Sequence, residues 1–280
     1  MKDGMKTDIK IGLSGSKILL TDKGTIKKYL PVNNPKRSKF QVMKQQSFNN
    51  NIFLGINVPK IIDIQKTYFE MENILGESYT EYFDKCSKND LDNFIYIIKN
   101  YFKVISTDST DYNPDLLNKL LIEKIDNLYK FSNHKSFLNF LKKEVESNIF
   151  DNIPKSYCHG DLSITNIIFV ENKLYFIDFI DSFVDTFLID LVKLKQDLFY
   201  KWALKIHSDN LRYNQSFNYI WKHIYEEYKN YFDNDFCNIL DCINLLRIEP
   251  YLKKEKQNLI LKNILIKTKY YEKFNRSYSR

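Results

Sequence analysis

Apolar and polar residues alternate with the period of a β-strand in the first part of the chain. Residues 8–30 read as three short strands, and residues 60–64 and 67–71 read as two more. The second and third strands meet at Asp22-Lys23-Gly24, a tight turn with glycine where a positive φ is needed. This pattern predicts a small antiparallel sheet near the start of the chain.

In most of the remaining chain, apolar residues recur every three to four positions, which is typical of amphipathic helices. Residues 35–54 read as one helix whose apolar stripe would be Phe40, Met43 and Phe48. Residues 81–153 and the segment after residue 191 also repeat apolar residues at helical spacing. Only 7 glycines and 6 prolines punctuate the chain, which favours long helices and short loops. We therefore expect an α+β protein with a small sheet and a larger helical part.

A second stretch with the strand pattern lies inside the helical part. Residues 167–170 and 174–177 are apolar runs separated by the polar turn Glu171-Asn172-Lys173, which predicts a β-hairpin. The hairpin would bring Asp178, at its end, beside Asn166, at its start. Carboxylate and amide oxygens are ligands that Mg²⁺ takes when phosphates complete its shell. Asp161, five residues before Asn166, would then be available to accept a hydroxyl proton.

These residues belong to a longer pattern of polar positions. The letters H-G-D-x-x-x-x-N span residues 159–166, and Ile177-Asp178-Phe179 and Asp190-Leu191 follow. The pattern resembles the catalytic segment of the aminoglycoside phosphotransferase branch of the protein-kinase-like superfamily, which also includes choline kinases. The resemblance implies a bilobal protein-kinase-like fold. Its parts would be a nucleotide-binding lobe at residues 1–72, with an antiparallel sheet and one helix, a hinge at 73–78, and a helical catalytic and acceptor-binding lobe at 79–280.

The same resemblance implies a reaction. A small-molecule kinase of this kind moves the γ-phosphate of ATP (or GTP) to a hydroxyl group, with Mg²⁺ held here by Asn166 and Asp178. Asp161 would be the catalytic base, mainly through its position. His159 would hold the loop of residues 159–166 in place, and the Asp190 side chain would accept hydrogen bonds from the backbone of that loop.

Further residues would hold the nucleotide if the resemblance extends to the first lobe. Backbone groups of a short glycine-containing loop would cradle the phosphates, and a hinge of the form M-E-x-x-x-G-E-S would bind adenine through its backbone. These positions are Ser14, Gly15 and Ser16 in the loop and Met71, Glu72 and Ile74 at the hinge.

The third strand should carry the lysine that neutralises the α- and β-phosphates. Lys27 fits the L-K-x-Y register of the family, and Lys28 would then point to the other face, so Lys27 is the preferred candidate and Lys28 the alternative. The helix glutamate that pairs with this lysine in kinase-like enzymes is absent. Gln45 occupies its expected place, and its amide could accept a hydrogen bond from the lysine without supplying charge.

Composition narrows the class of protein further. The chain is 44% hydrophobic and 28% charged, as in ordinary globular proteins, and no apolar run approaches the roughly 20 residues of a membrane helix. The start lacks the apolar region of a secretory signal, and the four cysteines show no metal-ligand spacing, so we expect reduced, buried thiols in a cytoplasmic protein. The net charge is +7, and residues 23–62 contain eight basic and no acidic residues, a face suited to an anionic ligand.

The acceptor is less sharply defined by the sequence. A sugar, an aminoglycoside or a related hydroxylated metabolite is favoured. Aminoglycosides are polycations, and carboxylates that could meet them in the last part of the chain are Glu226, Glu227, Asp233, Asp235 and Asp241. A choline or amino-alcohol kinase is the alternative, since an aromatic box for the ammonium group could come from Trp202, Tyr219, Trp221, Tyr225 and Tyr228.

Two hypotheses from other classes stay open. The missing helix glutamate would suit a nucleotide-binding pseudokinase that transfers no phosphate. The basic first lobe would suit a nucleic-acid-binding module, which is less favoured and would reveal itself by a steeply salt-dependent affinity. The oligomeric state has no signature in the sequence.

Overall fold

The computed structural model describes residues 9–11, 16–29, 35–49, 55–107, 110–207, 211–252 and 255–278. The chain divides into two compact units, Met1–Tyr82 with Thr165–Asp181, and Phe83–Ile164 with Ser182–Arg280. The segment that contains Asn166 and Asp178 therefore groups with the N-terminal sheet, although it follows residue 79 in the chain. The lobe boundaries given above, at residues 72 and 79, stay a prediction.

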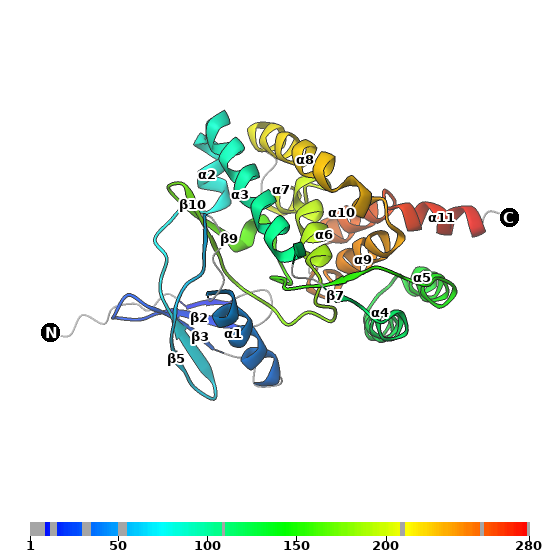
Figure 1. Cartoon of the computed structure of the whole chain (residues 1–280), viewed down its shortest axis with the longest axis horizontal. Helices are drawn as coiled ribbons and strands as arrows, with labels where there is room; N and C mark the ends of the chain where they lie inside the picture. The colour runs from blue at the N-terminus through cyan, green and yellow to red at the C-terminus, as the bar shows by residue number, and fades with distance from the viewer. Residues whose placement is uncertain are drawn as a thin grey trace. The chain divides into compact units, whose positions relative to one another are not determined.

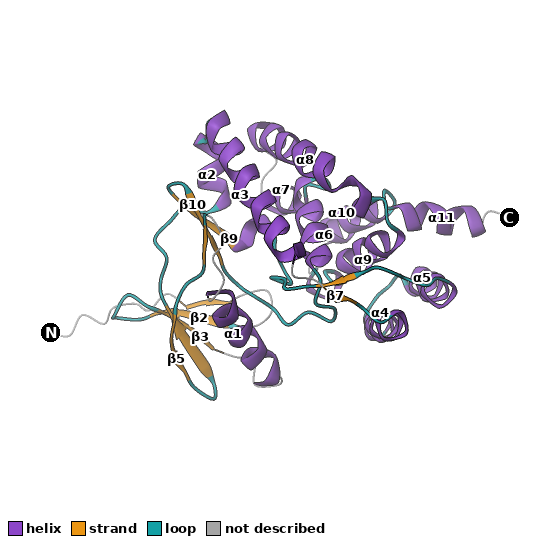
Figure 2. Ribbon diagram, viewed as in Figure 1, coloured by secondary structure: helices purple, strands orange, loops and turns teal. Residues whose placement is uncertain are grey.

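The first unit contains a five-stranded antiparallel sheet with strand order β1-β2-β3-β6-β5. Figure 2 shows these strands gathered together in orange. The prediction of three strands followed by two is confirmed. At the turn between β2 and β3, Gly24 has a φ of 73° and its N–H donates to the Thr21 carbonyl oxygen at 3.0 Å. The strands are β1 Ile9–Ile11, β2 Lys17–Leu20, β3 Ile26–Tyr29, β5 Ile61–Ile64 and β6 Tyr68–Met71.

One helix, α1 (Pro35–Asn49), belongs to the same unit. Its buried face is Val42, Gln45 and Phe48, each less than 5% exposed. The predicted apolar stripe was wrong for Phe40 and Met43, which are 50% and 52% exposed. The buried positions recur every three residues, and a polar residue occupies the middle one, which hides the true face from a count of apolar residues.

A second, three-stranded sheet completes the first unit. β9 (Ile167–Val170) and β10 (Lys173–Phe176) form the predicted antiparallel hairpin, and β4 (Ile56–Asn57), which the sequence did not predict, pairs with β10 in parallel. The backbone at Glu77, within the predicted hinge, lies directly against β9, because Glu77 and Phe169 exchange two hydrogen bonds of 2.8 and 2.9 Å.

The second unit is mainly helical (Figure 1). The apolar faces predicted for residues 81–153 are confirmed, since Leu91, Phe94 and Ile98 of one helix and Leu117 and Leu121 of another are buried. A short two-stranded sheet of β7 (Thr110–Asp111) and β8 (Pro154–Lys155) was not predicted. The helices are α3 Lys88–Thr107, α4 Pro114–Tyr129, α5 Lys135–Ser147, α6 Phe187–Leu198, α7 Trp202–His207, α8 Leu211–Phe232, α9 Asp235–Leu246, α10 Glu255–Leu265 and α11 Lys269–Tyr278, and α2 Tyr79–Lys85 crosses the division between the units.

Among the described residues, each helix is too short or too polar to cross a bilayer. All four cysteines are free and buried, as predicted. Cys158, beside the loop of residues 159–166, packs within 3.4 Å of the Ser182 hydroxyl and 3.6 Å of the Asp185 carboxylate.

Candidate active site

The hairpin fixes where Asn166 and Asp178 lie within the first unit. Asn166 ends a short 3₁₀ helix (Ile164–Asn166), and its carbonyl oxygen accepts a 3.0 Å hydrogen bond from the Ile177 N–H, which continues the pairing of Phe176 with Ile167. Asp178 follows at once and turns the chain sharply, with a φ of 61°. Left-handed backbone is uncommon outside glycine, although aspartate tolerates it, and such conformations gather at functional sites.

A lysine from the sheet meets Asp178. The ammonium group of Lys28 lies 2.9 Å from Asp178 Oδ1, and the Lys28 side chain is only 7% exposed. Lys27, the candidate preferred from the sequence, points to the other face of β3, where it pairs with Glu70 at 3.5 Å and lies 4.9 Å from the Tyr68 ring centre. Successive residues of a strand face opposite ways, and the side of β3 that meets Asp178 is that of Lys28. Which of the two lysines binds phosphate stays a prediction.

Gln45 also differs from its expected role. Its amide nitrogen donates to the Pro59 carbonyl oxygen at 2.7 Å and lies 3.9 Å from the Met71 sulfur, rather than meeting the strand lysine. The neighbouring Lys44 donates to the Ile180 carbonyl oxygen at 3.3 Å, two residues after Asp178. In this structure the buried Lys28 is therefore paired with Asp178 and not with α1.

The structure describes only some of the residues that were expected to contact the nucleotide. Ser14 and Gly15 lie outside the described residues, whereas Ser16 is buried just before β2. At the hinge, Met71 packs with Val42 and Phe69 in the core of the first unit. The Glu72 N–H donates to the Lys60 carbonyl oxygen at 3.0 Å, so a base at the hinge would meet the Glu72 carbonyl group rather than its N–H.

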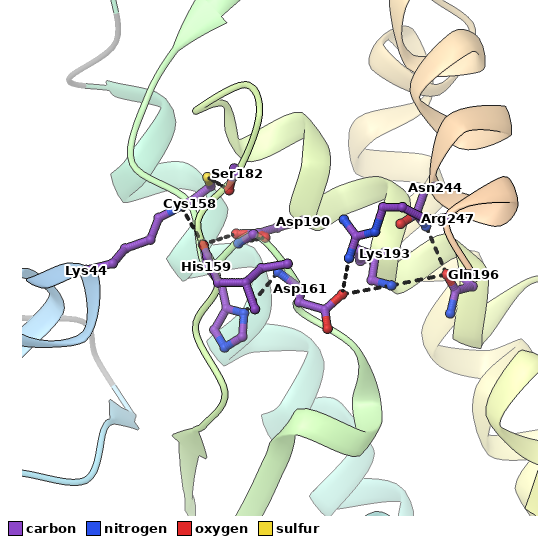
Figure 3. A network of polar contacts seen from close by, with 12 residues as sticks. Lys44, Cys158, His159, Asp161, Ser182, Asp190, Lys193, Gln196, Asn244 and Arg247 are labelled. Carbon is purple, nitrogen blue, oxygen red and sulfur yellow. Dashed lines mark hydrogen bonds and ion pairs between the residues drawn. The ribbon is translucent and has the colours of Figure 1, made fainter. Parts of the chain in front are cut away.

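The loop of residues 159–166 belongs mostly to the second unit, where a buried carboxylate holds it. Asp190 accepts hydrogen bonds from the backbone N–H groups of His159 and Gly160, at 2.7 and 2.8 Å, and from the Tyr101 hydroxyl at 2.8 Å (Figure 3). The predicted role of Asp190 is confirmed. Gly160 has a φ of 87°, a conformation that glycine adopts without strain, and Nδ1 of the buried His159 accepts from the Asp161 N–H at 3.2 Å.

Two cations from later parts of the chain bind the Asp161 carboxylate. Lys193 Nζ of α6 lies 2.8 Å from Asp161 Oδ1, and an Arg247 nitrogen, just after α9, lies 2.9 Å from the same oxygen. Sequence reasoning missed both residues. Lys193 had a signal, because it is a lysine inside the apolar run 191–194 and follows Asp190 by three residues, on the same side of a helix. Arg247, 86 residues from Asp161, had none.

These charges set the proton affinity of the site. Burial alone would raise the pKa of Asp161, but the attraction of Lys193 and Arg247 outweighs it and holds that pKa well below its usual range. Burial, opposed by Asp161, lowers the pKa of Lys193. Burial raises the pKa of the nearby Asp197 to about 6, although that carboxylate accepts a 2.8 Å hydrogen bond from the Ile164 N–H.

The carboxylates suggested for a polycationic acceptor are largely engaged elsewhere. Asp241 is 1% exposed and pairs with Lys195 at 2.6 Å, Glu227 pairs with Lys99 at 3.1 Å, and Asp235 pairs with Lys269 at 3.1 Å. These three acidic residues therefore do not combine into one acidic lining.

The suggested aromatic box is also divided. Trp221 and Tyr225 lie together, with ring centres 5.7 Å apart, in a pocket that Lys195, Lys267 and Lys269 also line. Tyr228 instead packs edge-on against Phe102 of the helical core at 5.4 Å. Other aromatic rings also line this pocket, but its three lysines disfavour the binding of an ammonium group there.

Comparison with solved structures defines the class of protein: the chain has the protein-kinase-like fold. The streptomycin–ATP–APH(2")-IIa ternary complex matches with a TM-score of 0.58 at 16% identity, over 95% of this chain and 93% of that chain. A glucosamine kinase in complex with glucosamine, ADP and inorganic phosphate matches with a TM-score of 0.57 at 9% identity, over 98% and 84%. Plasmodium vivax ethanolamine kinase matches with a TM-score of 0.53 at 15% identity, over 95% and 82%.

A family model also matches part of the chain. Residues 103–218, which include Asp161, Asn166 and Asp178, match the model of the phosphotransferase enzyme family, and the resemblance inferred from the motif is thereby confirmed. No curated protein sequence matches the chain. The family match and the kinase fold together support a small-molecule kinase.

Proposed function

We propose that this protein transfers the γ-phosphate of a nucleoside triphosphate to a hydroxyl group of a small acceptor, with Asp161 as the catalytic base. One observation carries the proposal. The segment that matches the phosphotransferase model contains a loop whose backbone Asp190 holds at 2.7 and 2.8 Å, and that loop presents Asp161 five residues before Asn166. The hairpin then returns Asp178 to Asn166.

The nucleotide is ATP or GTP in this proposal. The solved relatives include an ADP-bound and an ATP-containing aminoglycoside phosphotransferase and a GDP complex of another. Lys28, rather than Lys27, would bind the phosphates, because it is the strand lysine on the side of Asp178.

The side chains of Asn166 and Asp178 could bind a magnesium ion. Both side chains offer hard oxygen atoms, the Asp178 side chain is 39% exposed, and Lys28 binds only one of its two carboxylate oxygens within the described residues. Bound Mg²⁺ would neutralise charge on the phosphate oxygens. The residues that would hold it are Asn166 and Asp178.

Asp161 would orient the acceptor hydroxyl and take its proton. The acceptor oxygen forms a bond to the γ-phosphorus, the bond from that phosphorus to the bridging oxygen breaks, and the nucleoside diphosphate leaves with the electron pair. The low pKa of Asp161 makes it a weak base but is compatible with this role, because the hydroxyl group loses its proton late in a loose transition state and positioning dominates.

A sugar, an aminoglycoside or a related hydroxylated metabolite remains the proposed acceptor class. Two of the matching structures contain such molecules, streptomycin in one and glucosamine in the other, although an ethanolamine kinase also matches. The amino-alcohol alternative is weaker, because Trp221 and Tyr225 share their pocket with three lysines.

The test is an ATP-consumption screen over sugars, aminoglycosides and amino alcohols, with Asp161→Asn as the blank. Loss of the base at nearly constant shape should lower kcat by about 10²–10⁴-fold. Asp126→Asn, a surface carboxylate paired with Lys142, is the matched control and should keep full activity. Undiminished phosphate transfer by the Asp161→Asn variant would refute the assignment.

A further inference from the structure

A pocket of about 390 Å³ lies within the second unit. Its wall comes from the ends of α6 and α8, the start of α9 and the link between α10 and α11, elements that lie together in Figure 1. Pockets of this size hold small organic ligands. None of its lining residues has a role in the proposed phosphate transfer.

Three aromatic side chains form one side of this pocket. The ring centre of Trp221 lies 5.4 Å from that of Phe199 and 5.7 Å from that of Tyr225. Phe199 and Tyr225 are 46% and 38% exposed, although large aromatic rings gain most when they are buried. Exposed apolar side chains that gather in a pocket mark a place where a ligand can cover them. A planar ring that stacks on Trp221 and Tyr225 would do so.

A mostly buried amide supplies a hydrogen-bond acceptor. Asn238 lines the pocket and is 7% exposed. Its Nδ2 donates to the Asn234 carbonyl oxygen at 2.7 Å, which sets the orientation of the amide, and this is the only hydrogen bond of that side chain within the described residues. Buried polar atoms normally have a partner, so the Asn238 side-chain oxygen is suited to an N–H group of a ligand.

Three lysines and one carboxylate, Asp233, complete the polar part of the wall. Lys195 and Lys269 already pair with carboxylates outside the wall, at 2.6 and 3.1 Å, so their charges are balanced. The ammonium group of Lys267 is exposed and has no hydrogen-bond or ion-pair partner among the described residues. Lys267 is therefore the cation that an anionic group can meet, while Asp233 could accept a second N–H group.

We propose that this pocket is a second ligand site, which binds a planar nitrogen heterocycle that carries one anionic group. The ring stacks on Trp221 and Tyr225, a ring N–H donates to Asn238 Oδ1, and the anionic group pairs with Lys267. Indole carboxylates and nucleoside monophosphates have this chemistry. The proposal goes beyond phosphate transfer and does not depend on it.

The pocket and the proposed base lie at opposite ends of α9. Asn238 is near the start of that helix, whereas Arg247, which binds Asp161, directly follows its end. At about 1.5 Å of rise per residue, the two positions are about 13 Å apart along the axis. Lys193 and Lys195 point to different sides of α6, since two residues span about 200° of turn, and Lys193 binds Asp161 whereas Lys195 lines the pocket. A ligand in the pocket would therefore not occupy the place of the phosphate acceptor.

Calorimetry of the wild-type protein without nucleotide tests the ligand class. Indoleacetate has the ring, the N–H and the carboxylate. Indoleacetamide lacks the charge, N-methylindoleacetate lacks the N–H, and cyclohexylacetate lacks the aromatic ring. We expect each of these to bind about threefold or more weakly than indoleacetate, because a hydrogen bond and an aromatic contact are each worth about that factor. Equal or tighter binding by any of them would overturn the proposal, as would no binding of either indoleacetate or uridine monophosphate at millimolar concentrations.

Variants assign the charge preference to Lys267. Lys267→Gln should remove most of the preference for indoleacetate over indoleacetamide, and Lys267→Arg should keep it. The measurement is the ratio of the two Kd values within each variant. Lys256→Gln is the matched control, because Lys256 is an exposed lysine of α10 that does not line the pocket. A folded Lys267→Gln variant with the wild-type ratio would overturn the proposal.

Trp221 reports where the ligand binds. The chain contains two tryptophans, so Trp202→Phe leaves Trp221 as the only source of tryptophan fluorescence. Saturating uridine monophosphate should quench this emission, and Tyr225→Leu should raise its Kd by about threefold or more. Tyr96→Leu, which removes an exposed ring of α3, is the control and should leave the Kd unchanged. Emission that stays the same at saturation would overturn the proposal.

Asp161→Asn separates this site from the proposed function. Indoleacetate should bind this variant as it binds the wild-type protein, whether or not the protein transfers phosphate. Binding that is lost in Asp161→Asn but kept in Lys267→Gln would place the ligand beside the proposed base and overturn the second site. Phosphate transfer without Lys267-dependent binding would leave the proposed function standing and refute this inference.

Discussion

Lys193 and Arg247 form ion pairs with Asp161, the carboxylate that would serve as the base. These ion pairs determine the pH at which Asp161 takes up a proton. The pKa of Asp161 is lower than that of a free carboxyl group because Lys193 and Arg247 stabilise the charged form more than burial disfavours it. The group therefore stays ionised through the neutral and mildly acidic range. Activity that depends on the free carboxylate is lost only when the pH falls through this low value.

Lys193→Met should move the acid limb of the pH profile to higher pH. Removing one of the two cations raises the pKa of Asp161, so the variant becomes protonated, and inactive, at a pH where the wild-type protein still works. The measurement is kcat/KM against pH, which reports the free enzyme. Lys195→Met on the same helix, paired with Asp241 at 2.6 Å, is the control, and its acid limb should not move. Coincident limbs for Lys193→Met and wild type would contradict the assigned role.

The two adjacent lysines of β3 make a second prediction. Lys28→Met should raise KM for the nucleotide strongly, by about tenfold or more, since it removes a charged hydrogen-bond donor from the side of Asp178. Lys27→Met, which breaks the 3.5 Å pair with Glu70 and the contact with the Tyr68 ring at a partly exposed site, should change KM little. The reverse order of the two effects would restore the original choice of Lys27.

At the scale of elements, the backbone at Gly76, within the predicted hinge, lies unusually close to β9. A Cβ atom on Gly76 would lie 2.6 Å from Ile168 Cγ2 and 2.7 Å from the Phe169 carbonyl oxygen. The adjacent Tyr82 ring stacks on Phe169 with ring centres 4.0 Å apart. The hairpin that carries Asn166 and Asp178 is therefore held from one side by the segment 76–82.

Gly76→Ala should destabilise the protein by about 1–3 kcal/mol, because the added methyl group overlaps backbone that cannot move freely. Denaturant unfolding measures this difference. Gly24→Asn is the contrast, since Gly24 needs a positive φ but has no atom within 4 Å of the added Cβ, and asparagine tolerates that backbone. Equally small changes in the free energy of unfolding for the two substitutions would show that β9 moves to make room for the methyl group.

At the scale of the whole molecule, the proposed ligands of the nucleotide and the proposed base fall in different compact units. Asn166, Asp178 and Lys28 belong to the first unit, and Asp161 belongs to the second. The two functions, holding the metal–nucleotide pair and accepting a proton, are thus carried by separately packed parts of the chain, and substitutions can test them separately.

Mg²⁺ and a non-hydrolysable ATP analogue should raise the unfolding temperature together, more than either alone. Ligand at about 100 times its Kd contributes about 2.7 kcal/mol to the free energy of unfolding. Asp178→Asn should remove the magnesium-dependent part, whereas Asp161→Asn should keep it. A wild-type protein whose nucleotide response is the same with and without Mg²⁺ would instead favour the pseudokinase hypothesis.

Much of the fold was open to prediction because local patterns specify it. Period-2 alternation located the strands of the first sheet, and the hairpin register followed from two apolar runs around a polar turn. The buried face of α1 was mispredicted, because burying the polar Gln45 depends on the Pro59 carbonyl oxygen, which is 14 residues away. Strand β4 is two residues long and pairs with β10 from far along the chain, so it has no local signal.

The sequence by itself determined the hairpin that joins Asn166 to Asp178, since it depends on a short segment and one turn. The anchoring role of Asp190 was expected from the resemblance instead, because its backbone partners lie 30 and 31 residues earlier. Only the tertiary structure decided that Lys28 meets Asp178 and that Lys193 and Arg247 bind Asp161. Alternation along a strand shows that neighbouring lysines face opposite ways but not which side meets a partner 150 residues later. Contacts between distant helices arise from packing, and packing brings Lys193 and Arg247 to the same oxygen of Asp161.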